Sequence, residues 1–149
     1  NMQTLILMQD VPASGKSFYA ELIKSGLERN GYTKVVITSA DDFFLDINGQ
    51  CVFNQALLSK AHNECYFQTE TALLNGNSFV IVDNTNMKSG WVHRYKQLAR
   101  KLNVDLQVVH TYTIPEVCKR RNNERQYGKA LSETVMNKFI SMTSDNLTL

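Results

Sequence analysis

The sequence predicts an α/β domain in which helices cover both faces of a parallel sheet. Short apolar runs alternate with longer segments whose apolar residues recur at helical spacing, which is the pattern of repeated strand–helix units. One run, FVIV at residues 79–82, contains no polar position, as expected for a strand buried on both faces. We expect three layers, with four or five parallel strands in the sheet and a helical lid at the carboxyl-terminal end.

Strands are expected where apolar residues follow one another without interruption. The first is residues 4–8 (TLILM), and the second is residues 34–39 (KVVITS). The third is residues 79–82, and the fourth is residues 106–112. Ligands of such sheets bind beyond the carboxyl ends of the strands, so the polar residues that follow each run are the candidates for function.

Helices are expected between and after these strands. Residues 17–29 place Phe18, Leu22 and Ile23 at helical spacing, and Gly31 is a plausible stop. The next helix is expected over residues 54–74, closed by Asn-Gly. Ser89 can cap a third helix that contains Trp91 and Tyr95. Two more are expected, one with Pro115 in its first turn and one over residues 132–142.

Length and composition indicate one domain. The 149 residues suit a single core, the 43% hydrophobic and 20% charged residues are ordinary for a globular protein, and no linker or repeat interrupts the chain. We therefore expect a single domain over residues 1–149. The net charge of +2 is too small to argue for nucleic acid by itself.

No membrane or structural metal is expected. No apolar run approaches the ~20 residues of a membrane span. The three cysteines form no C-x-x-C pair, and the three histidines lack metal-ligand spacing. Reduced thiols are typical of cytosolic proteins, so we expect a cytoplasmic location, which for a viral protein is the host cytoplasm. The oligomeric state is left open by the sequence.

The segment DVPASGKS, residues 10–17, lies between the first strand and the first helix. In that context SGKS predicts a phosphate-binding loop, because loop N–H groups and a helix N-terminus converge there on an anion. Lys16 would reach the β- and γ-phosphates, and the Ser17 hydroxyl would bind Mg²⁺. The alternative is an ordinary turn in which serine caps the helix. The expected nucleotide contacts are Pro12, Ala13, Ser14, Gly15, Lys16, Ser17 and Phe18.

Asp10 occupies the position of the first glycine in a full Walker A loop, G-x-x-x-x-G-K-[ST]. Aspartate can adopt left-handed backbone conformations, but its carboxylate opposes a polyphosphate. We expect nucleotide binding to be weakened rather than abolished, so that Asp10→Gly tightens the affinity for ATP. The alternative is a catalytically impaired module that binds a nucleotide or a partner.

Two aspartates, Asp41 and Asp42, follow the second strand in the segment SADDFF. A carboxylate at this strand end can accept the proton of an acceptor hydroxyl while phosphate is transferred to it. Asp41 is the candidate base and Asp42 the second choice, and both are expected to contact the substrate. The alternative role is a helix N-cap, which aspartate serves well.

The third strand ends in the polar sequence DNTN, residues 83–86. Asp83 is a candidate to hold Mg²⁺ through water. Asn84, Thr85 and Asn86 offer short polar groups that can position a substrate at this edge of the sheet. The alternative is an ordinary turn rich in asparagine and threonine.

Basic residues crowd the segment from Lys119 to Lys129, and Arg121 and Arg125 share one helical face because they are four apart. Two guanidinium groups on a lid can clamp the γ-phosphate and neutralise the charge of the transition state. The alternative is a solvated helix end, where the helix dipole favours basic residues.

Taken together, these motifs resemble the 5′-hydroxyl polynucleotide kinase family, typified by the kinase half of the bacteriophage end-healing enzyme. They are also similar to related P-loop kinase domains of larger animal proteins. The matching segments, in order over nearly the whole chain, are PASGKS, DDFF, AHNEC, VDNTN and R-N-x-x-R. The resemblance implies an adenylate-kinase-like fold with a lid, ATP and Mg²⁺ as cofactors, and a 5′-hydroxyl end of RNA or DNA as acceptor. It also implies nucleotide contacts for Lys16 and Ser17, a catalytic base at Asp41 and a lid arginine at Arg125.

Two positions depart from the family pattern, Asp10 and Phe44. The phage enzyme has an arginine at the place of Phe44 that holds the 3′-phosphate of the acceptor, so that role does not transfer. Phe43 and Phe44 can instead stack on a base of the substrate, although two aromatic residues after a strand are more often part of the core.

The leading functional hypothesis is in-line phosphate transfer from ATP to a 5′-hydroxyl of RNA or DNA. Asp41 would orient and deprotonate the hydroxyl, while Lys16, Mg²⁺ and Arg125 stabilise the γ-phosphoryl group. A kinase for a small metabolite on the same fold is the alternative, and it predicts a closed acceptor pocket rather than an open groove.

Overall fold

The computed structural model describes residues 3–9, 16–84, 89–110, 134 and 137, with side chains except at positions 16, 17 and 89. Within this part of the chain, no helix is both long and apolar enough to cross a membrane. The expected carboxyl-terminal lid and its helices lie outside the described residues.

The predicted α/β fold is confirmed. Its sheet is formed by β1 (Thr4–Gln9), β2 (Val35–Thr38), β3 (Phe79–Val82) and β4 (Asp105–His110). The order of these four strands across the sheet is β2-β3-β1-β4, and all neighbours are parallel. β1 pairs with β3 on one side and with β4 on the other, so it is an interior strand of the sheet.

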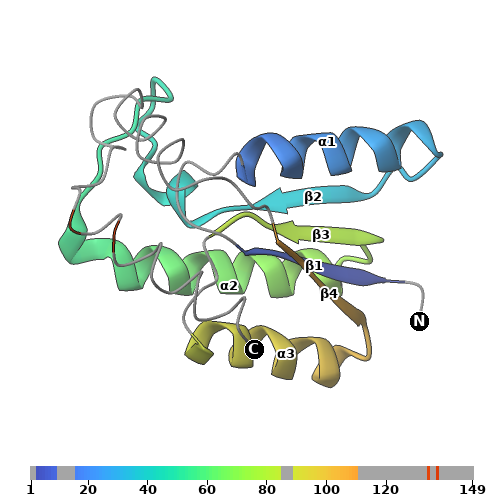
Figure 1. Ribbon diagram of the computed structural model, residues 1–149. Coiled ribbons are helices and arrows are strands. Elements are labelled where there is room, and N and C mark those ends of the chain that lie inside the picture. The colour runs from blue at the N-terminus through green and yellow to red at the C-terminus, as the bar shows by residue number, and fades with distance from the viewer. Residues whose placement is uncertain (1–2, 10–15, 85–88, 111–133, 135–136, 138–149) are drawn as a thin grey trace.

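In the part of the chain that the structure describes, three α-helices cover the sheet in two outer layers. Figure 1 shows α1 (Lys16–Arg29) on one face, and α2 (Leu58–Leu74) with α3 (Ser89–Leu102) on the other. Each helix runs back against the direction of the strands, so the amino ends of all three lie at the carboxyl edge of the sheet. This edge is where ligands bind in doubly covered parallel sheets.

The two faces of β1 explain why its sequence is apolar throughout. Leu5 and Leu7 are completely buried in the core beneath α2 and α3, whereas Ile6 and Met8 are buried in a separate core beneath α1. Because successive side chains of a strand point to opposite faces, both sets must be apolar when helices cover both faces.

The face that α1 presents to the sheet differs in part from the one expected. Ile23 packs against the core as expected, together with Ala20 and Leu27, whereas Phe18 and Leu22 are 65% and 46% exposed. Ile23 lies three residues after Ala20 and Leu27 four residues after Ile23, which is also helical spacing.

The second predicted helix begins later than expected. Residues 55–57 form a 3₁₀ turn, η2 (Gln55–Leu57), in which the Asn54 side chain accepts a 3.0 Å hydrogen bond from the N–H of Ala56. The α-helix starts after this turn, at Leu58, and ends where expected, before Asn75 and Gly76. Gly76 has φ of +86°, a conformation that glycine adopts without strain.

Candidate active site

Three described segments meet at the carboxyl edge of the sheet: the start of α1, the turn that follows β2, and the residues that follow β3 (Figure 1). The ends of β2 and β3 are level, because Thr38 pairs with Val82. The N–H of Asp83 then donates a 2.8 Å hydrogen bond to the carbonyl of Thr38. The polar residues after the two strands therefore begin side by side, at the edge of the sheet where the sequence placed them.

The strand–loop–helix context of the predicted phosphate loop is present. β1 ends at Gln9 and α1 begins at Lys16, and the first turn of α1 contains no acidic residue. A helix start of this kind favours an anion through its free N–H groups and its dipole. Asp10 and the loop residues Pro12, Ala13, Ser14 and Gly15 lie outside the described residues, and the side chains of Lys16 and Ser17 are not described.

The turn after β2 is a short 3₁₀ helix, η1 (Ala40–Phe44), and its cap is not an aspartate. The hydroxyl of Ser39 accepts a 3.2 Å hydrogen bond from the N–H of Asp41. The capping role that the sequence left open for an aspartate is thus filled by the preceding serine. The side chains of Asp41 and Asp42 are exposed at the edge of the sheet.

Asn84 has a different position from the one its sequence context indicated. Its side chain is buried, and its Oδ1 accepts a 2.8 Å hydrogen bond from the N–H of Ala40. Its Nδ2 donates to the sulfur of Cys65 on α2 at 3.4 Å. Asn84 thus ties the end of β3 to the turn that contains Asp41 and to α2.

Phe44, predicted to contact the substrate, also faces inward. It is only 5% exposed and belongs to the core beneath α2 and α3. Its ring lies 5.3 Å from that of Phe43 and 5.1 Å from that of Phe53, measured between centroids. Stacking of Phe44 on a base is incompatible with this burial, and the core role that the sequence left open is the one observed.

Asp83 presents an oxygen at the junction of β2 and β3. Its Oδ1 is buried, although the residue as a whole is partly exposed. A carboxylate oxygen is also a preferred ligand of Mg²⁺. The described residues contain no group of three or more histidine, cysteine or acidic side chains that could hold a metal by themselves.

Sequence comparison decides the family. A protein family described as an AAA domain matches residues 5–144. The chain belongs to this AAA domain family. A 97-residue stretch of the AAA domain, 65% of the chain, is 34% identical to NEDD4-binding protein 2 of Homo sapiens. The match spans 5% of the length of that human protein.

Solved structures show the fold of the AAA domain. It matches a chain of the Pnkp1/Rnl/Hen1 RNA repair complex with a TM-score of 0.75 and 19% identity, over 97% of this chain and 45% of the other. It matches Kti12 of Chaetomium thermophilum, solved with ADP-AlF3, with a TM-score of 0.71 and 18% identity, over 93% and 79%. These matches establish a P-loop kinase-like fold.

The sequence did not single out a stacked arginine on α3 of the AAA domain. The guanidinium carbon of Arg94 lies 4.3 Å from the ring centroid of Tyr66 on α2 and 4.4 Å from that of Trp91. Its Nη1 donates a 3.1 Å hydrogen bond to Oδ1 of Asn63. The sequence shows that Trp91 and Arg94 are three residues apart and so share a helical face. That Tyr66 and Asn63 of α2 also contact Arg94 follows only from the fold.

Besides the loop residues, four further predicted site residues of the AAA domain lie outside the described residues. They are Thr85, Asn86, Arg121 and Arg125. Phe18 is described, and its exposed ring makes an edge-to-face contact with Tyr19 at 5.8 Å between centroids.

Proposed function

We propose that this AAA domain transfers the γ-phosphate of ATP to the 5′-hydroxyl of an RNA or DNA strand. The observation that supports the proposal most is the bond between Ala40 and Asn84, because it fixes an exposed aspartate at the edge where α1 begins. The P-loop kinase-like fold and the resemblance of the motifs to a kinase family support the binding of ATP at this site. The whole chain, residues 1–149, would act as one kinase domain in the cytoplasm.

Asp41 is the proposed general base. Its carboxylate is exposed on a turn that three contacts hold in place, namely the Ser39 cap, the Asn84 bond and the burial of Phe44. An exposed carboxylate can accept the proton of an incoming hydroxyl as the new phosphorus–oxygen bond forms and the bond from the γ-phosphorus to the leaving ADP breaks. A fixed turn would hold the Asp41 carboxylate where it can position the acceptor hydroxyl in line with the γ-phosphorus. Positioning of this kind supplies much of the catalysis in phosphate transfer.

The nucleotide would lie at the amino end of α1. Lys16, the first residue of that helix, would contact the β- and γ-phosphates, and Arg121 and Arg125 would contact the γ-phosphate from the lid. These cationic groups would neutralise charge on the transferring phosphoryl group. Loop residues 12–15 would contribute backbone N–H groups.

The donor set fits Mg²⁺ bound together with a nucleotide. Magnesium in such sites uses one or two protein oxygens and several phosphate oxygens rather than a complete protein cage. Asp83, through water, and the Ser17 hydroxyl would be the protein ligands, and the ion would offset charge on the β- and γ-phosphates.

An acceptor larger than a metabolite is favoured by the exposure of the acceptor side. Asp41 and Asp42 are both exposed, as are residues 45–50 that follow them. A kinase for a small metabolite would instead bury its base in a closed pocket, as the alternative hypothesis predicts.

A direct assay tests the proposal. The protein is incubated with labelled ATP, Mg²⁺ and a 5′-hydroxyl oligonucleotide, as RNA and as DNA, beside the Lys16→Ala variant. We expect transfer by the wild-type protein to at least one oligonucleotide and none by the variant. ATP binding without transfer to either oligonucleotide would reject the proposed acceptor.

A further inference from the structure

We propose that the groove between α2 and α3 binds the single-stranded nucleic acid that continues from the 5′ end. The strand would follow a stripe of α3 formed by Trp91, Arg94, Gln97 and Lys101. This inference rests on the proposed function for the identity of the ligand. The groove itself is defined by described contacts alone.

The stripe is one face of α3. Its members are separated by three, three and four residues, which aligns them along a helix. Contacts place that face against α2. The guanidinium of Arg94 lies over the rings of both Trp91 and Tyr66, and Nζ of Lys101 lies 3.5 Å from Oε2 of Glu70.

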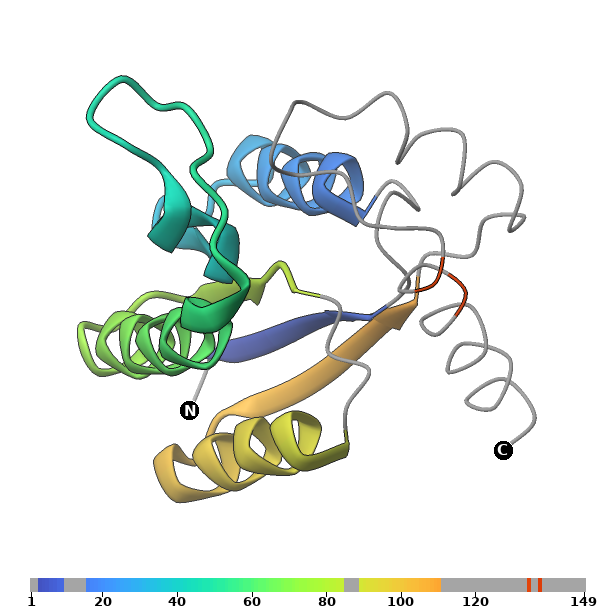
Figure 2. The same ribbon diagram turned by 90° about the vertical axis from the view of Figure 1, so that its left-hand side faces the viewer.

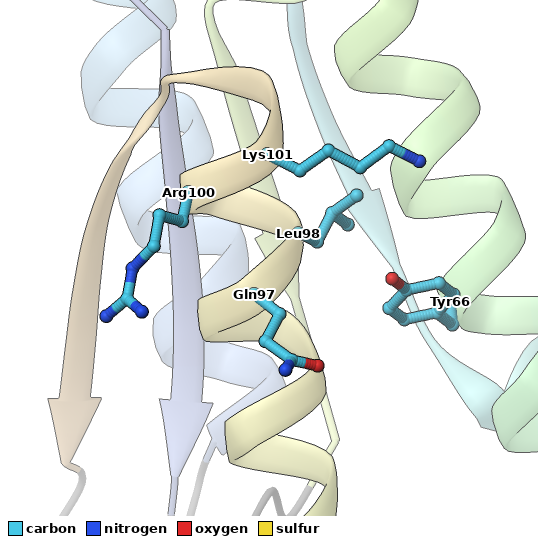
Figure 3. A pocket seen from close by; sticks show the side chains of 5 residues that line it. All are labelled: Tyr66, Gln97, Leu98, Arg100 and Lys101. Carbon is cyan, nitrogen blue, oxygen red and sulfur yellow. The ribbon is translucent and has the colours of Figure 1, made fainter.

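A cavity of about 490 Å³ opens along this face. It is lined by Tyr66 of α2 and by Gln97, Leu98, Arg100 and Lys101 of α3. Figure 3 shows Leu98 and Lys101 extending from α3 towards α2, whereas Arg100 extends away from α2. An aromatic ring therefore lies on one wall, and amide and ammonium groups lie on the other.

The charge of α3 is unlike that of the chain. The helix contains two arginines, two lysines and no carboxylate, although the formal net charge of the whole protein is only +2. The helix dipole favours cations in the last turn, at Arg100 and Lys101, but it does not account for Arg94 or Lys96 nearer the start. A concentration of cations on one helix is complementary to a phosphate backbone.

Among the described residues of this groove, Lys101 forms an ion pair with Glu70 that still allows its ammonium group to contact a phosphate. In its contact with Glu70 the Lys101 side chain is 71% exposed, whereas the Glu70 side chain is 23% exposed. Water screens the Lys101 side of this pair, so a phosphate group can compete with the carboxylate for the ammonium group. Aromatic rings interleaved with cations are the usual lining of sites for single strands, since bases stack on the rings.

The groove begins at the carboxyl edge of the sheet, the same edge as Asp41. Its aromatic end lies in the first turns of α3, and α3 starts at the carboxyl edge of the sheet, where Asp41 also lies. Figure 2 shows α2 between the η1 turn and α3. A strand whose 5′ end reaches Asp41 can therefore pass the amino end of α2 and enter the groove.

Fluorescence gives a test that does not require catalysis, because Trp91 is the only tryptophan of the chain. The protein is titrated with single-stranded DNA and with RNA of about 12 nucleotides at several salt concentrations. We expect binding to quench Trp91. Lys101→Glu should weaken binding about ten-fold and lower the slope of log affinity against log salt by about one.

Arg29→Glu is the matched control, because it makes the same charge change at an exposed position on α1, on the opposite face of the sheet. We expect it to change the affinity far less than Lys101→Glu does. Equal effects of the two variants, or no quenching of Trp91 by either nucleic acid, would overturn the inference.

A transfer assay separates this inference from the proposed function. Wild-type protein should have a lower KM for the longer acceptor than for a trinucleotide, and Lys101→Glu should reduce that difference more than Arg29→Glu does. Quenching without phosphate transfer would reject the proposed function and leave the groove. Transfer with a KM independent of length in both variants would reject the groove alone.

Discussion

Oδ1 of Asn84 accepts a 2.8 Å hydrogen bond from the backbone N–H of Ala40, so the end of β3 holds the turn that presents Asp41. The same side chain donates to the sulfur of Cys65 on α2, so one buried amide links a strand, a turn and a helix. Removing it would leave a buried N–H without its acceptor, which costs about 1–3 kcal/mol. The position of Asp41, the proposed base, thus depends on Asn84, which holds the turn in place.

Asn84→Ala should lower kcat for phosphate transfer about ten-fold or more, because a base displaced by a fraction of an ångström is poorly aligned. The affinity for ATP should change little, since the nucleotide site is formed by other segments. Steady-state kinetics and ATP titration measure the two effects. Asn77→Ala is the control, because it removes a 2.8 Å bond to the carbonyl of Ala72 at the other end of α2. A similar loss of kcat in both variants would indicate general destabilisation.

Asp41→Asn should reduce kcat by about a hundred-fold or more, because an amide cannot accept the proton of the hydroxyl. Asp42→Asn changes the same charge one residue further along the same turn, and we expect a much smaller effect. Single-turnover transfer with each variant measures the difference. The reverse order would move the base to Asp42, and two small effects would exclude both.

Phe44→Ala should lower the free energy of unfolding by about 3–5 kcal/mol, because it leaves a cavity in the core beneath α2 and α3. Phe67→Ala, at a ring that is 55% exposed, should change it by about 0.5 kcal/mol or less. Urea denaturation gives both values. If Phe44→Ala instead raised the KM for the acceptor without loss of stability, the ring would be part of the substrate site after all.

The stability of the domain should depend on Tyr95 at high pH. Burial raises the pKa of Tyr95 well above its ordinary value of 10.0, and the neighbouring Cys65 raises it further. The folded state therefore keeps this hydroxyl protonated above pH 10, where the unfolded state loses the proton. The stabilisation is complete below about pH 10 and is lost progressively as the pH rises towards the folded pKa.

Tyr95→Phe removes this contribution and leaves the other titrating groups in place. Between pH 9 and pH 11, wild-type protein should lose about 1 kcal/mol more unfolding free energy than the variant does. Urea denaturation at both pH values measures the difference. Parallel losses in the two proteins would show that Tyr95 titrates in the ordinary range when folded.

Local patterns were sufficient for the strands and for the order of the elements. The four strands were predicted near their observed positions because the sheet is covered on both faces, which leaves uninterrupted apolar runs in the sequence. The face of α1 was predicted less well. Phe18 and Leu22 have helical spacing and yet are exposed, whereas Ala20, which the sequence did not single out, is completely buried.

The types of residue at each strand end can be read from the amino-acid sequence: a lysine at the start of the first helix, aspartates after the second strand and polar residues after the third. Which side chains in these segments face outward depends on how the strands and helices pack together. Asn84 faces inward because its amide accepts a hydrogen bond from the buried N–H of Ala40. Phe44 faces inward because its ring fills part of the core beneath α2 and α3. In both cases the partners come from segments that are distant in sequence. The α2–α3 groove is decided in the same way, because Tyr66 and Arg94 meet only when two helices pack on one face of the sheet.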